Sequence, residues 1–565
     1  MRERRTRRHG LAAVWAMVAI FALSACTGIP TSSSVVVGPS VDSRIIGGVD
    51  FNPPGPIAGA SQEQVLRGFI QAFLGPQGDY KVARQFLSSA FASKWDARNG
   101  VIVRTGGFSF TQVDATTMVY STNTQAVVDA SGAYTELTTP QPQSLTFKFV
   151  QEQGQWRISQ APNGIVLSEG TFRTIFSPQT LYFLDPALKN LVPDLRWFPS
   201  GTAATRIVGA LLAGPPPWLQ GAVTSVFPDG TQLSPPRVVT VESGVAQVDL
   251  SSEALAAKGT ERQLMQLQLA LSLSGVPSIR SVVMTVNGAP YQVDEAAGNL
   301  PAVHPQVDAR AIVLQHGKFG YYAAGRVTPL DQLSDEVVRL GPRAATVGSD
   351  AQLAAVLGAG GVYAVTAGGG PGTLLDQRAG LIAPALDDYG FVWAAQRGSA
   401  SSIAVYDASG KAYPLAPTLP ADAGIVSMAV SRDGARMAVL LDTEAGSRLV
   451  VAAILRDASQ GFAPTTLGDP ILDVVVAGES PVGVDWADEL SVATLTSDAE
   501  SSSVEEYQVG GPRKILGRPG DAIQVVGSNS VESLRVLGAD HVVQVQRGGN
   551  WSSTQIEVDF IAGQR

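Results

Sequence analysis

The chain has 565 residues and a mass of 58.9 kDa, which exceeds what one hydrophobic core can organise and predicts about three to four domains. Its content of 45% hydrophobic and 16% charged residues excludes a disordered protein. Five arginines and one glutamate give residues 1–25 a charge of +4, so the remaining residues carry −13 within the total of −9. An acidic body of this kind excludes nucleic acid as a ligand, and its surface would be repelled by anionic head groups.

The first 25 residues have the organisation of a secretory signal peptide. A basic segment, MRERRTRRHG, precedes the apolar run LAAVWAMVAIFALSA, which is shorter than the about twenty residues that span a bilayer. The residues at its end resemble the lipobox of bacterial lipoproteins; they are Leu23, Ser24, Ala25 and Cys26. The resemblance implies cleavage before Cys26, an S-diacylglyceryl group on its thiol and a further acyl group on its new amino terminus. Two or more acyl chains anchor a protein stably, whereas one chain binds only marginally.

Cys26 is the only cysteine of the chain, so lipidation would leave no thiol for a disulfide. The alternative interpretation is a buried cysteine that lies near a signal sequence by chance. Residues 26–60 are rich in Pro, Gly and Ser and include the run NPPGP, which excludes helix and central strand. We expect these residues to form a flexible tether with an r.m.s. span of about 30 Å.

Residues 61–165 are predicted to form an α+β domain. Ser61 and Gln64 make a capping-box pattern at the start of a helix that a Gly-Pro pair ends, and a second helix is predicted over residues 79–95. Alternating strands follow, and the last two form a hairpin with a G-x-W-x-I ending at Ile158. This order resembles the nuclear-transport-factor-2-like or cystatin-like cone. The segment has no histidine and no evident acid–base pair, which favours a structural or binding domain over an enzyme.

Residues 166–300 alternate strands and helices. Two hairpins are predicted, one around Glu242-Ser243-Gly244 and one across Asn287-Gly288, and a long helix is predicted to start at a capping box of Thr260 and Gln263. The segments LLAGP, SVFPDGTQL, GVAQVDLS, the long helix and VVMTVNG follow one another in the order found in the GerMN domain, which they resemble. That resemblance implies an α/β interaction module with no known catalytic residues.

Three acidic residues of this region could surround a site, namely Asp229, Glu242 and Asp249. The alternative is turn chemistry, since Asp229-Gly230 is a turn pair and Asp249 ends a strand. We favour the turn interpretation.

Residues 305–565 are predicted to form a β-propeller of five or six blades. Short apolar strands alternate with polar turns, and the turn acids Asp350, Asp388, Asp433 and Asp488 lie 38, 45 and 55 residues apart. The stretch SRDGARMAV resembles the strand-connecting turn of TolB-like and WD40-like propellers. We expect residues 313–330 to complete the last blade and close the ring. The alternative is a β-sandwich with irregular repeats.

The sequence predicts no catalytic, metal-binding or cofactor-binding residue. The four histidines are His9, His304, His316 and His541, and their spacing matches no zinc pattern. Hydrolase, metalloprotease, P-loop and dinucleotide-binding motifs do not occur in the sequence. We therefore predict that the protein is not an enzyme and uses no cofactor.

Lipobox, cone, GerMN module and propeller, in this order, resemble the LpqB family of actinobacterial lipoproteins across nearly the whole chain. The resemblance implies a lipoprotein anchored at the extracytoplasmic face of the cell membrane. It implies that the extracellular sensor of the histidine kinase MtrB is the partner, and that the protein is an accessory of the MtrA–MtrB two-component system in cell-wall homeostasis and division. Two alternatives stay open: an envelope hydrolase acting on cell-wall glycan or peptide, and a solute-binding lipoprotein.

Overall fold

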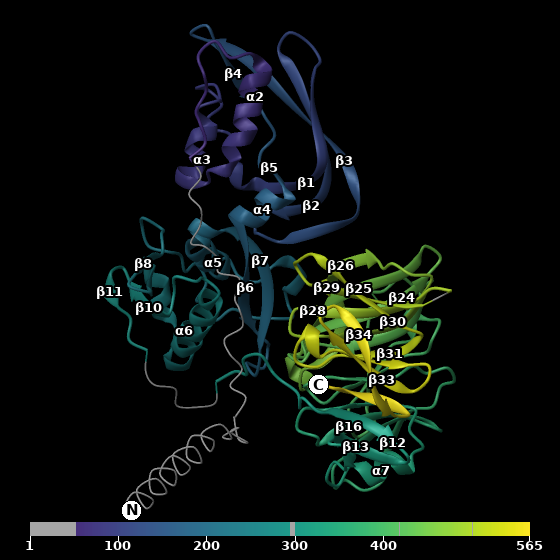
Figure 1. Cartoon of the computed structure of the whole chain (residues 1–565). Coiled ribbons are helices and arrows are strands. Elements are labelled where there is room, and N and C mark those ends of the chain that lie inside the picture. The colour runs from purple at the N-terminus through teal and green to yellow at the C-terminus, as the bar shows by residue number, and fades with distance from the viewer. Residues whose placement is uncertain (1–51, 294–299, 417, 500) are drawn as a thin grey trace, which may run out of the picture. The chain divides into compact units, whose positions relative to one another are not determined.

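The computed structural model describes residues 52–293, 300–416, 418–499 and 501–565 (Figure 1). The predicted signal peptide, the lipobox that ends at Cys26 and the tether up to residue 51 lie outside the described residues. From residue 48 onward, the contacts of the chain form a single compact unit. The three regions described below all belong to this unit.

The first region is a five-stranded sheet with short helices on one face (Figure 1). Its strands are β1 (Gly100–Gln112), β2 (Thr117–Asp129), β3 (Tyr134–Glu152), β4 (Gln155–Gln160) and β5 (Ile165–Ser168). They lie in the order β4-β3-β2-β1-β5, and neighbours are antiparallel except for β1 and β5, which are parallel. The predicted hairpin is present, because β3 and β4 pair across a tight turn.

Helix α2 (Gln62–Gln71) begins where the sequence predicts. The Gln64 amide donates to the Ser61 hydroxyl oxygen at 3.3 Å, and the Ser61 amide donates to the Gln64 side-chain oxygen at 2.8 Å. Both halves of the predicted capping box are therefore present. Val65 and Phe69 of this helix are buried in the core of the first region.

The second helix is shorter than predicted, since α3 spans Gln77–Arg84 instead of residues 79–95. Beyond α3 the backbone pairs with β4. The Ser88 amide donates to the Ile158 carbonyl at 2.8 Å, and the Ile158 amide donates to the Phe86 carbonyl at 2.9 Å. Pairing with the sheet replaces the helical hydrogen bonds, and helical spacing of apolar residues does not reveal such a competitor.

Helix α4 (Glu169–Ile175) leads from the first region into a two-stranded hairpin, β6 (Phe176–Leu184) and β7 (Leu191–Pro199). All nine residues of β7 are buried. This hairpin, residues 176–199, is called the central hairpin below, because its residues contact all three regions.

The second region is an α/β domain. Its elements are α5 (Ala203–Leu212), β8 (Thr240–Glu242), β9 (Val245–Leu250), α6 (Gly259–Ser274), β10 (Ser281–Val286) and β11 (Ala289–Pro290). The strand order is β11-β10-β9-β8, and the parallel neighbours β9 and β10 are connected through α6. Both predicted hairpins are present, since β8 pairs with β9 and β10 pairs with β11.

The predicted capping box of α6 at Thr260 and Gln263 is wrong. The helix begins at Gly259, and the amide of its N-cap residue Lys258 donates to the Glu261 carboxylate at 2.7 Å. A carboxylate accepts a backbone hydrogen bond more strongly than an amide does, and it also interacts favourably with the helix dipole. The acidic residue therefore sets the start of the helix.

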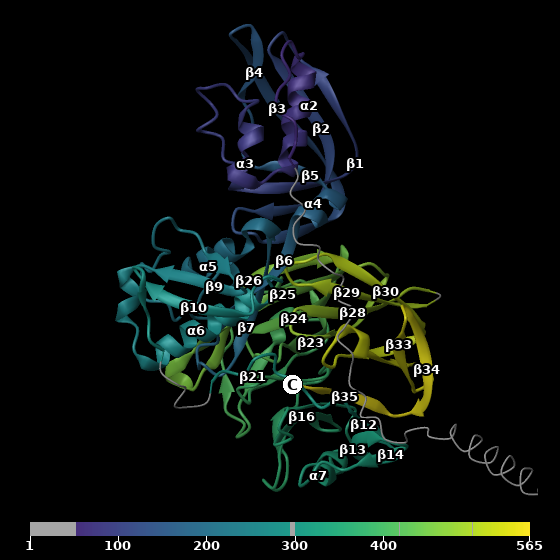
Figure 2. The same cartoon turned by 60° about the vertical axis from the view of Figure 1, so that its left-hand side comes forward.

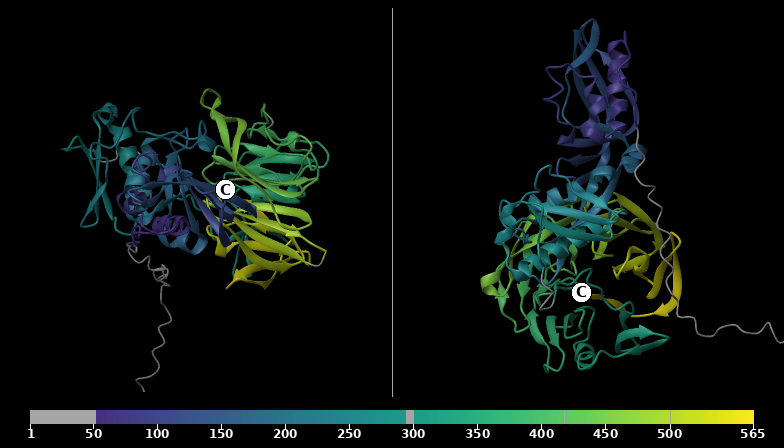
Figure 3. Two further views of the ribbon diagram at one scale, coloured as in Figure 1. Left: turned by 90° about the horizontal axis from the view of Figure 1, so that it is seen from above. Right: turned by 90° about the vertical axis from the view of Figure 1, so that its left-hand side faces the viewer.

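The third region is a ring of small antiparallel sheets around the C-terminal end of the chain (Figures 2 and 3). Four of the sheets have four strands each. They are β19–β22 (Ala385–Leu386, Val392–Ala394, Ala404–Tyr406, Ala412–Tyr413), β23–β26 (Gly424–Val430, Arg436–Thr443, Gly446–Asp457, Ala463–Val475), β27–β30 (Ser480–Trp486, Ser491–Ser497, Ser502–Gln508, Arg513–Gly520) and β31–β34 (Ala522–Val526, Arg535–Gly538, Val542–Arg547, Asn550–Glu557).

The remaining strands form one eight-stranded sheet that contains both ends of the ring. They are β12 (Ala311–Gln315), β13 (Lys318–Ala323), β14 (Arg326–Thr328), β15 (Ala344–Val347), β16 (Leu353–Gly358), β17 (Gly361–Thr366), β18 (Thr373–Asp376) and β35 (Phe560–Gln564), with α7 (Ser334–Arg339) between β14 and β15. The last strand, β35, is antiparallel to β12 and parallel to β15. Strands β12 to β14 therefore complete the final blade together with β35, as predicted. The ring arrangement rules out the alternative of a β-sandwich. The described strands of the ring form six groups of four.

Candidate binding site

The three acids of the second region do not form one site. Asp249 accepts hydrogen bonds from the Thr285 hydroxyl at 2.6 Å and from the Gly288 amide at 2.8 Å, and so it fixes the β10–β11 turn. Partial burial raises the pKa of Asp249, but these hydrogen bonds outweigh that effect and leave the pKa below its ordinary value. Asp229 and Glu242 are exposed, and Glu242 lies at the opposite end of β9 from Asp249. The turn interpretation is thereby supported.

The four recurrent turn acids of the propeller lie between the first and second strands of successive blades. Asp433 is the most deeply buried of the four. It accepts from the Ser431 hydroxyl at 2.6 Å and from the Ala435 amide at 2.9 Å, and it pairs with the buried guanidinium of Arg436. Asp350, by contrast, is exposed and accepts from the backbone of its own turn. These residues are structural, in agreement with the turn prediction.

His304 lies at the junction of the second and third regions. Its Nδ1 is 2.5 Å from a carboxylate oxygen of Glu489, and its ring meets the ring of Tyr182 edge-on at a centroid distance of 5.5 Å. The Tyr182 hydroxyl donates to the other oxygen of Glu489 at 3.2 Å. His304 and Glu489 line a cavity of about 290 Å³. His316 and His541 lie apart from it, in two separate turns of the propeller.

No group of three or more His, Cys, Asp or Glu side chains suited to a metal ion is present among the residues that the structure describes. Within the same residues, no helix is long and apolar enough to cross a bilayer.

The central hairpin joins the second region to the propeller through directional contacts. The Tyr389 hydroxyl donates to the Asp185 carboxylate at 2.6 Å, and the Asn190 side chain donates to the Asp388 carboxylate at 3.0 Å. Burial, together with the adjacent Asp185 charge, raises the pKa of Tyr389 above its ordinary value of 10.0, and its hydroxyl, which is already protonated at physiological pH, is the donor. These hydrogen bonds fix the register of the hairpin on the propeller.

A continuous hydrophobic core lies beneath these contacts. It includes buried residues of both regions, such as Val248 and Leu269 of the second region and Leu440 and Trp486 of the propeller. The guanidinium of Arg436 lies 4.7 Å from the centre of the Trp486 ring. Because the apolar surface is shared and excluded from water, the two regions form one body rather than two loosely connected domains. We call this interface the sealed junction.

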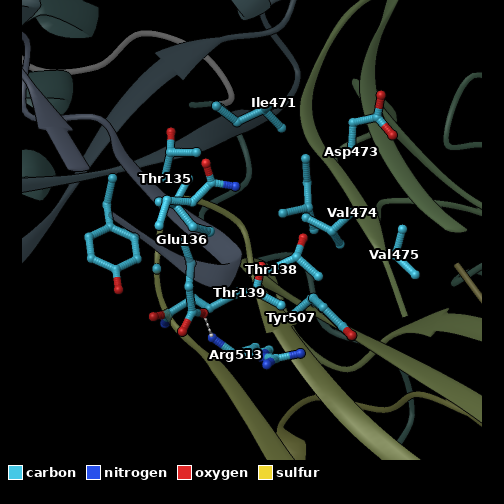
Figure 4. Close-up of a pocket in the computed structure, with 17 residues that line it drawn as sticks. Thr135, Glu136, Thr138, Thr139, Ile471, Asp473, Val474, Val475, Tyr507 and Arg513 are labelled. Carbon is cyan, nitrogen blue, oxygen red and sulfur yellow. Dashed lines mark hydrogen bonds between the residues drawn. The ribbon is translucent and has the colours of Figure 1, made fainter. Parts of the chain in front are cut away.

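A second interface, between β3 and the propeller, is open. It contains a cavity of about 300 Å³ lined by residues 134–139 and Gln141 of β3, residues 471–475 of β26 and residues between Tyr507 and Arg513. Figure 4 shows the β3 residues facing Val474 and Val475 across this space. One hydrogen bond crosses it, from the Arg513 amide to the Glu136 carboxylate at 2.7 Å (Figure 4). We call this cavity the interdomain groove.

The walls of the interdomain groove are partly apolar and partly exposed. Ile471, Leu472 and Val474 are half-buried, and Val475 is 43% exposed. A cavity whose wall combines half-buried and exposed apolar side chains is a candidate interaction site.

Sequence reasoning did not identify the groove residues. No motif or unusual residue type sets residues 471–475 or residues 135–139 apart from other parts of the sequence. Their common cavity arises because segments more than 300 residues apart in the chain meet. Among them, Val475 is distinguished by its exposure, and exposure is a property of the folded chain.

Three family models match successive parts of the chain. The model described as Lipoprotein LpqB, N-terminal domain, matches residues 55–173. The model described as Sporulation and spore germination matches residues 180–292. The model described as Lipoprotein LpqB beta-propeller domain matches residues 317–558.

Curated relatives of the chain are found across actinobacteria. The chain is 30% identical to Lipoprotein LpqB of Cutibacterium acnes, with 55% of each chain aligned. It is 28% identical to Lipoprotein LpqB of Bifidobacterium longum, over 54% of this chain and 55% of the other. The chain thus spans about half the length of these two relatives. With Lipoprotein LpqB of Mycolicibacterium smegmatis it shares 26% identity over 85% of each chain.

Among solved structures, the first GerMN domain of the sporulation protein GerM from Bacillus subtilis is similar to part of the chain. The two are 23% identical, and the match covers 22% of this chain and 94% of the GerM domain with a TM-score of 0.19.

Proposed function

Because the chain belongs to the LpqB family of lipoproteins, we propose that it is a lipid-anchored accessory protein that binds the extracellular sensor of the histidine kinase MtrB. Binding of this kind changes the activity of the MtrA–MtrB system only if the protein prefers one state of the sensor, and the shift equals the difference in binding free energy. The proposed outcome is control of cell-wall homeostasis and division.

The observation that supports this proposal is the pairing of a rigid body with an open groove. The sealed junction fuses the second region and the propeller into one unit, and the interdomain groove offers partly apolar surface at its side. A rigid body with a preformed groove binds a partner with little loss of conformational entropy. The relatives are named as lipoproteins and not as enzymes, and we propose that this protein acts by binding without catalysis.

The anchor is proposed to be the lipidated Cys26, within the lipobox of Leu23, Ser24 and Ala25. An acidic body has no electrostatic attraction to the membrane, so the acyl chains would supply the attachment. A tether raises the effective concentration of a membrane-bound partner to the millimolar range, and a weak contact then suffices. The proposed location is the extracytoplasmic face of the cell membrane.

Crosslinking in intact membranes tests the proposed function. We expect the wild-type chain to crosslink to the kinase sensor, and we expect Cys26→Ala to leave the membrane fraction and lose the crosslink. Absence of the sensor from wild-type crosslinks contradicts the partner. A Cys26→Ala chain that is processed and still membrane-bound contradicts the anchor, and cleavage of cell-wall fragments by the purified protein contradicts the non-enzymatic role.

A further inference from the structure

We propose that the interdomain groove binds an extended segment of a partner polypeptide, which adds as a new strand to the free edge of β26. The identity of that partner as the kinase sensor rests on the proposed function, whereas the mode of binding rests on the groove alone.

The lining of the groove shows that both strands face it with their edges. Side chains of a strand alternate between its two faces, so a cavity against one face is lined by every second residue. The groove is lined instead by the consecutive residues 134–139 of β3 and 471–475 of β26. Backbone N–H and C=O groups therefore border the cavity.

The second edge of each strand is unpaired along the groove. β26 is the last strand of its sheet, and residues 472–475 pair with β25 alone; the isolated bridge between Thr466 and Ala416 lies before the groove segment. β3 pairs with β2 on one side, and β4 covers its other side only from Lys148 to Glu152. Within the described part of the chain, no strand pairs with the free edge of residues 134–139 or of residues 471–475. Free strand edges are the templates on which extended peptides bind.

Of the two edges, β26 is the better template. Residues 472–475 pair in unbroken register with residues 448–451 of β25, so their outward N–H and C=O groups keep regular spacing. The register of β3 shifts between Glu136 and Gln141, which interrupts the regular spacing on that side. β26 therefore accepts the new strand, and β3 forms the opposite wall.

Prolines limit the available edge to the groove. Pro140 and Pro142 follow the groove segment of β3, and Pro464 and Pro470 precede the groove segment of β26. Proline has no N–H and protects a strand edge from pairing. The groove segments contain no proline, and the five residues of β26 correspond to about 17 Å of extended chain.

The groove also specifies the side chains of its occupant. Leu472 and Val474 lie on one face of β26 and Val475 lies on the other, so apolar contacts are available on both faces of an added strand. The acids of the rim already have partners, since Asp473 pairs with Arg448 at 2.6 Å and Glu136 accepts from the Arg513 amide. The side chains of Arg513 and Lys514 are exposed at one end. The complementary occupant is an extended segment with alternating apolar residues and an acidic residue beside them.

A pair of matched variants tests the site. Val475 and Val283 both lie in strands and are both 43% exposed, but Val283 belongs to β10, outside the groove. The full chain in detergent is titrated with the purified sensor domain. We expect Val475→Asp to weaken binding at least tenfold and Val283→Asp to change it less than twofold. Equal effects of the two variants, or none from Val475→Asp, overturn the site.

Hydrogen exchange tests the mode of binding. We expect the bound sensor domain to slow amide exchange in residues 471–475, because a paired edge amide is protected. We also expect an overlapping twelve-residue peptide of the sensor to compete, and the same peptide with N-methylated alternate amides to lose the competition. Protection elsewhere, or full activity of the N-methylated peptide, overturns strand addition while leaving the partner intact.

A displayed library of random peptides separates the two proposals when the sensor does not bind. We expect selection on the wild-type chain, with Val475→Asp as counter-selection, to return alternating apolar sequences with an acidic residue. If such peptides are selected and their binding slows amide exchange in residues 471–475, the groove proposal is supported even though the kinase sensor is not the partner. A library that returns no sequence dependent on Val475 overturns the groove.

Discussion

The sealed junction and the interdomain groove meet at the same loop of the propeller, yet they differ in how completely their surfaces are buried. At Gly510 the carbonyl accepts a hydrogen bond from the Trp197 indole at 3.0 Å, and the same residue lines the groove. On the junction side, apolar residues are buried and Asp433 pairs with the buried Arg436. On the groove side, strand edges are unpaired and the Val475 side chain is exposed. The contrast teaches that one side stabilises the protein, while the other keeps surface available for a partner.

The largest expected effect comes from a buried charge of the sealed junction. Asp433→Ala leaves the fully buried guanidinium of Arg436 without its carboxylate, which should cost about 3–5 kcal/mol of unfolding free energy. Asp350→Ala is the control, because it removes the corresponding acid of another blade where that acid is exposed. We expect the control to cost less than about 1 kcal/mol. Urea denaturation measures the unfolding free energy of both variants. Equal losses would show that the sealed junction does not contribute more to stability than the exposed turn of Asp350.

A backbone position tests how closely the hairpin and the propeller approach. Gly510 has φ of +81°, and a Cβ there would lie 2.7 Å from the Leu195 carbonyl oxygen. Gly510→Ala should therefore cost about 2–4 kcal/mol, from backbone strain and from the clash. Gly549 has φ of +87° with open space around it, so Gly549→Ala should cost only the strain, about 1 kcal/mol. Thermal unfolding measures the stability loss of both variants, and the difference between the two losses gives the cost of the clash. A difference near zero would mean that the hairpin and the propeller can move apart at Gly510.

Asp249 tests whether an acid outside both interfaces is purely structural. Its folded-state pKa lies below the ordinary value of 3.8, so its contribution to stability is full above that pH and is lost as the pH falls through the folded pKa. Asp249→Asn should lower the unfolding free energy at pH 7 by less than about 1 kcal/mol, since the group is largely solvated. The difference should shrink below about pH 4. A pH-independent difference between the two unfolding curves would contradict this account.

The smallest expected effect is on the stability of the groove variants. Val475→Asp and Val283→Asp should each change the unfolding free energy by less than about 1 kcal/mol, because both side chains are partly exposed in strands. Thermal unfolding of the full chain measures this change. A much larger loss for Val475→Asp would mean that the groove is a packed interface, and it would remove the contrast with the sealed junction.

Much of the fold could be predicted from local sequence patterns. The capping box of Ser61 and Gln64, the Asn287-Gly288 hairpin and the recurring turn acids all form as expected, because each depends on residues within a few positions of one another. The predicted length of the second helix was wrong because strand β4 pairs with the backbone after Arg84. The predicted start of α6 was wrong because the Glu261 carboxylate is a stronger acceptor than the Gln263 amide. Both failures have the same cause: the intrinsic preference of a short segment is weaker than a hydrogen-bond partner that the folded chain supplies.

The candidate site could not be predicted in the same way. Val475 and Glu136 are ordinary strand residues, and nothing near them in the sequence distinguishes them. Asp249 and Asp229 look more functional, yet one fixes a turn and the other is an exposed turn residue. Residue type identified the turns correctly, whereas the groove depends on which strand edges remain unpaired after folding.

The sequence by itself determined the order of the domains, the capped first helix, the hairpin turns and the closing of the ring by residues 313–330, since periodicity and turn chemistry act over short distances. Only the tertiary structure decided that the central hairpin fuses the second region to the propeller, and that β3 and β26 leave a groove between them. The physical reason is that burial and the pairing of strand edges depend on segments hundreds of residues apart, and a linear pattern does not record which of them meet.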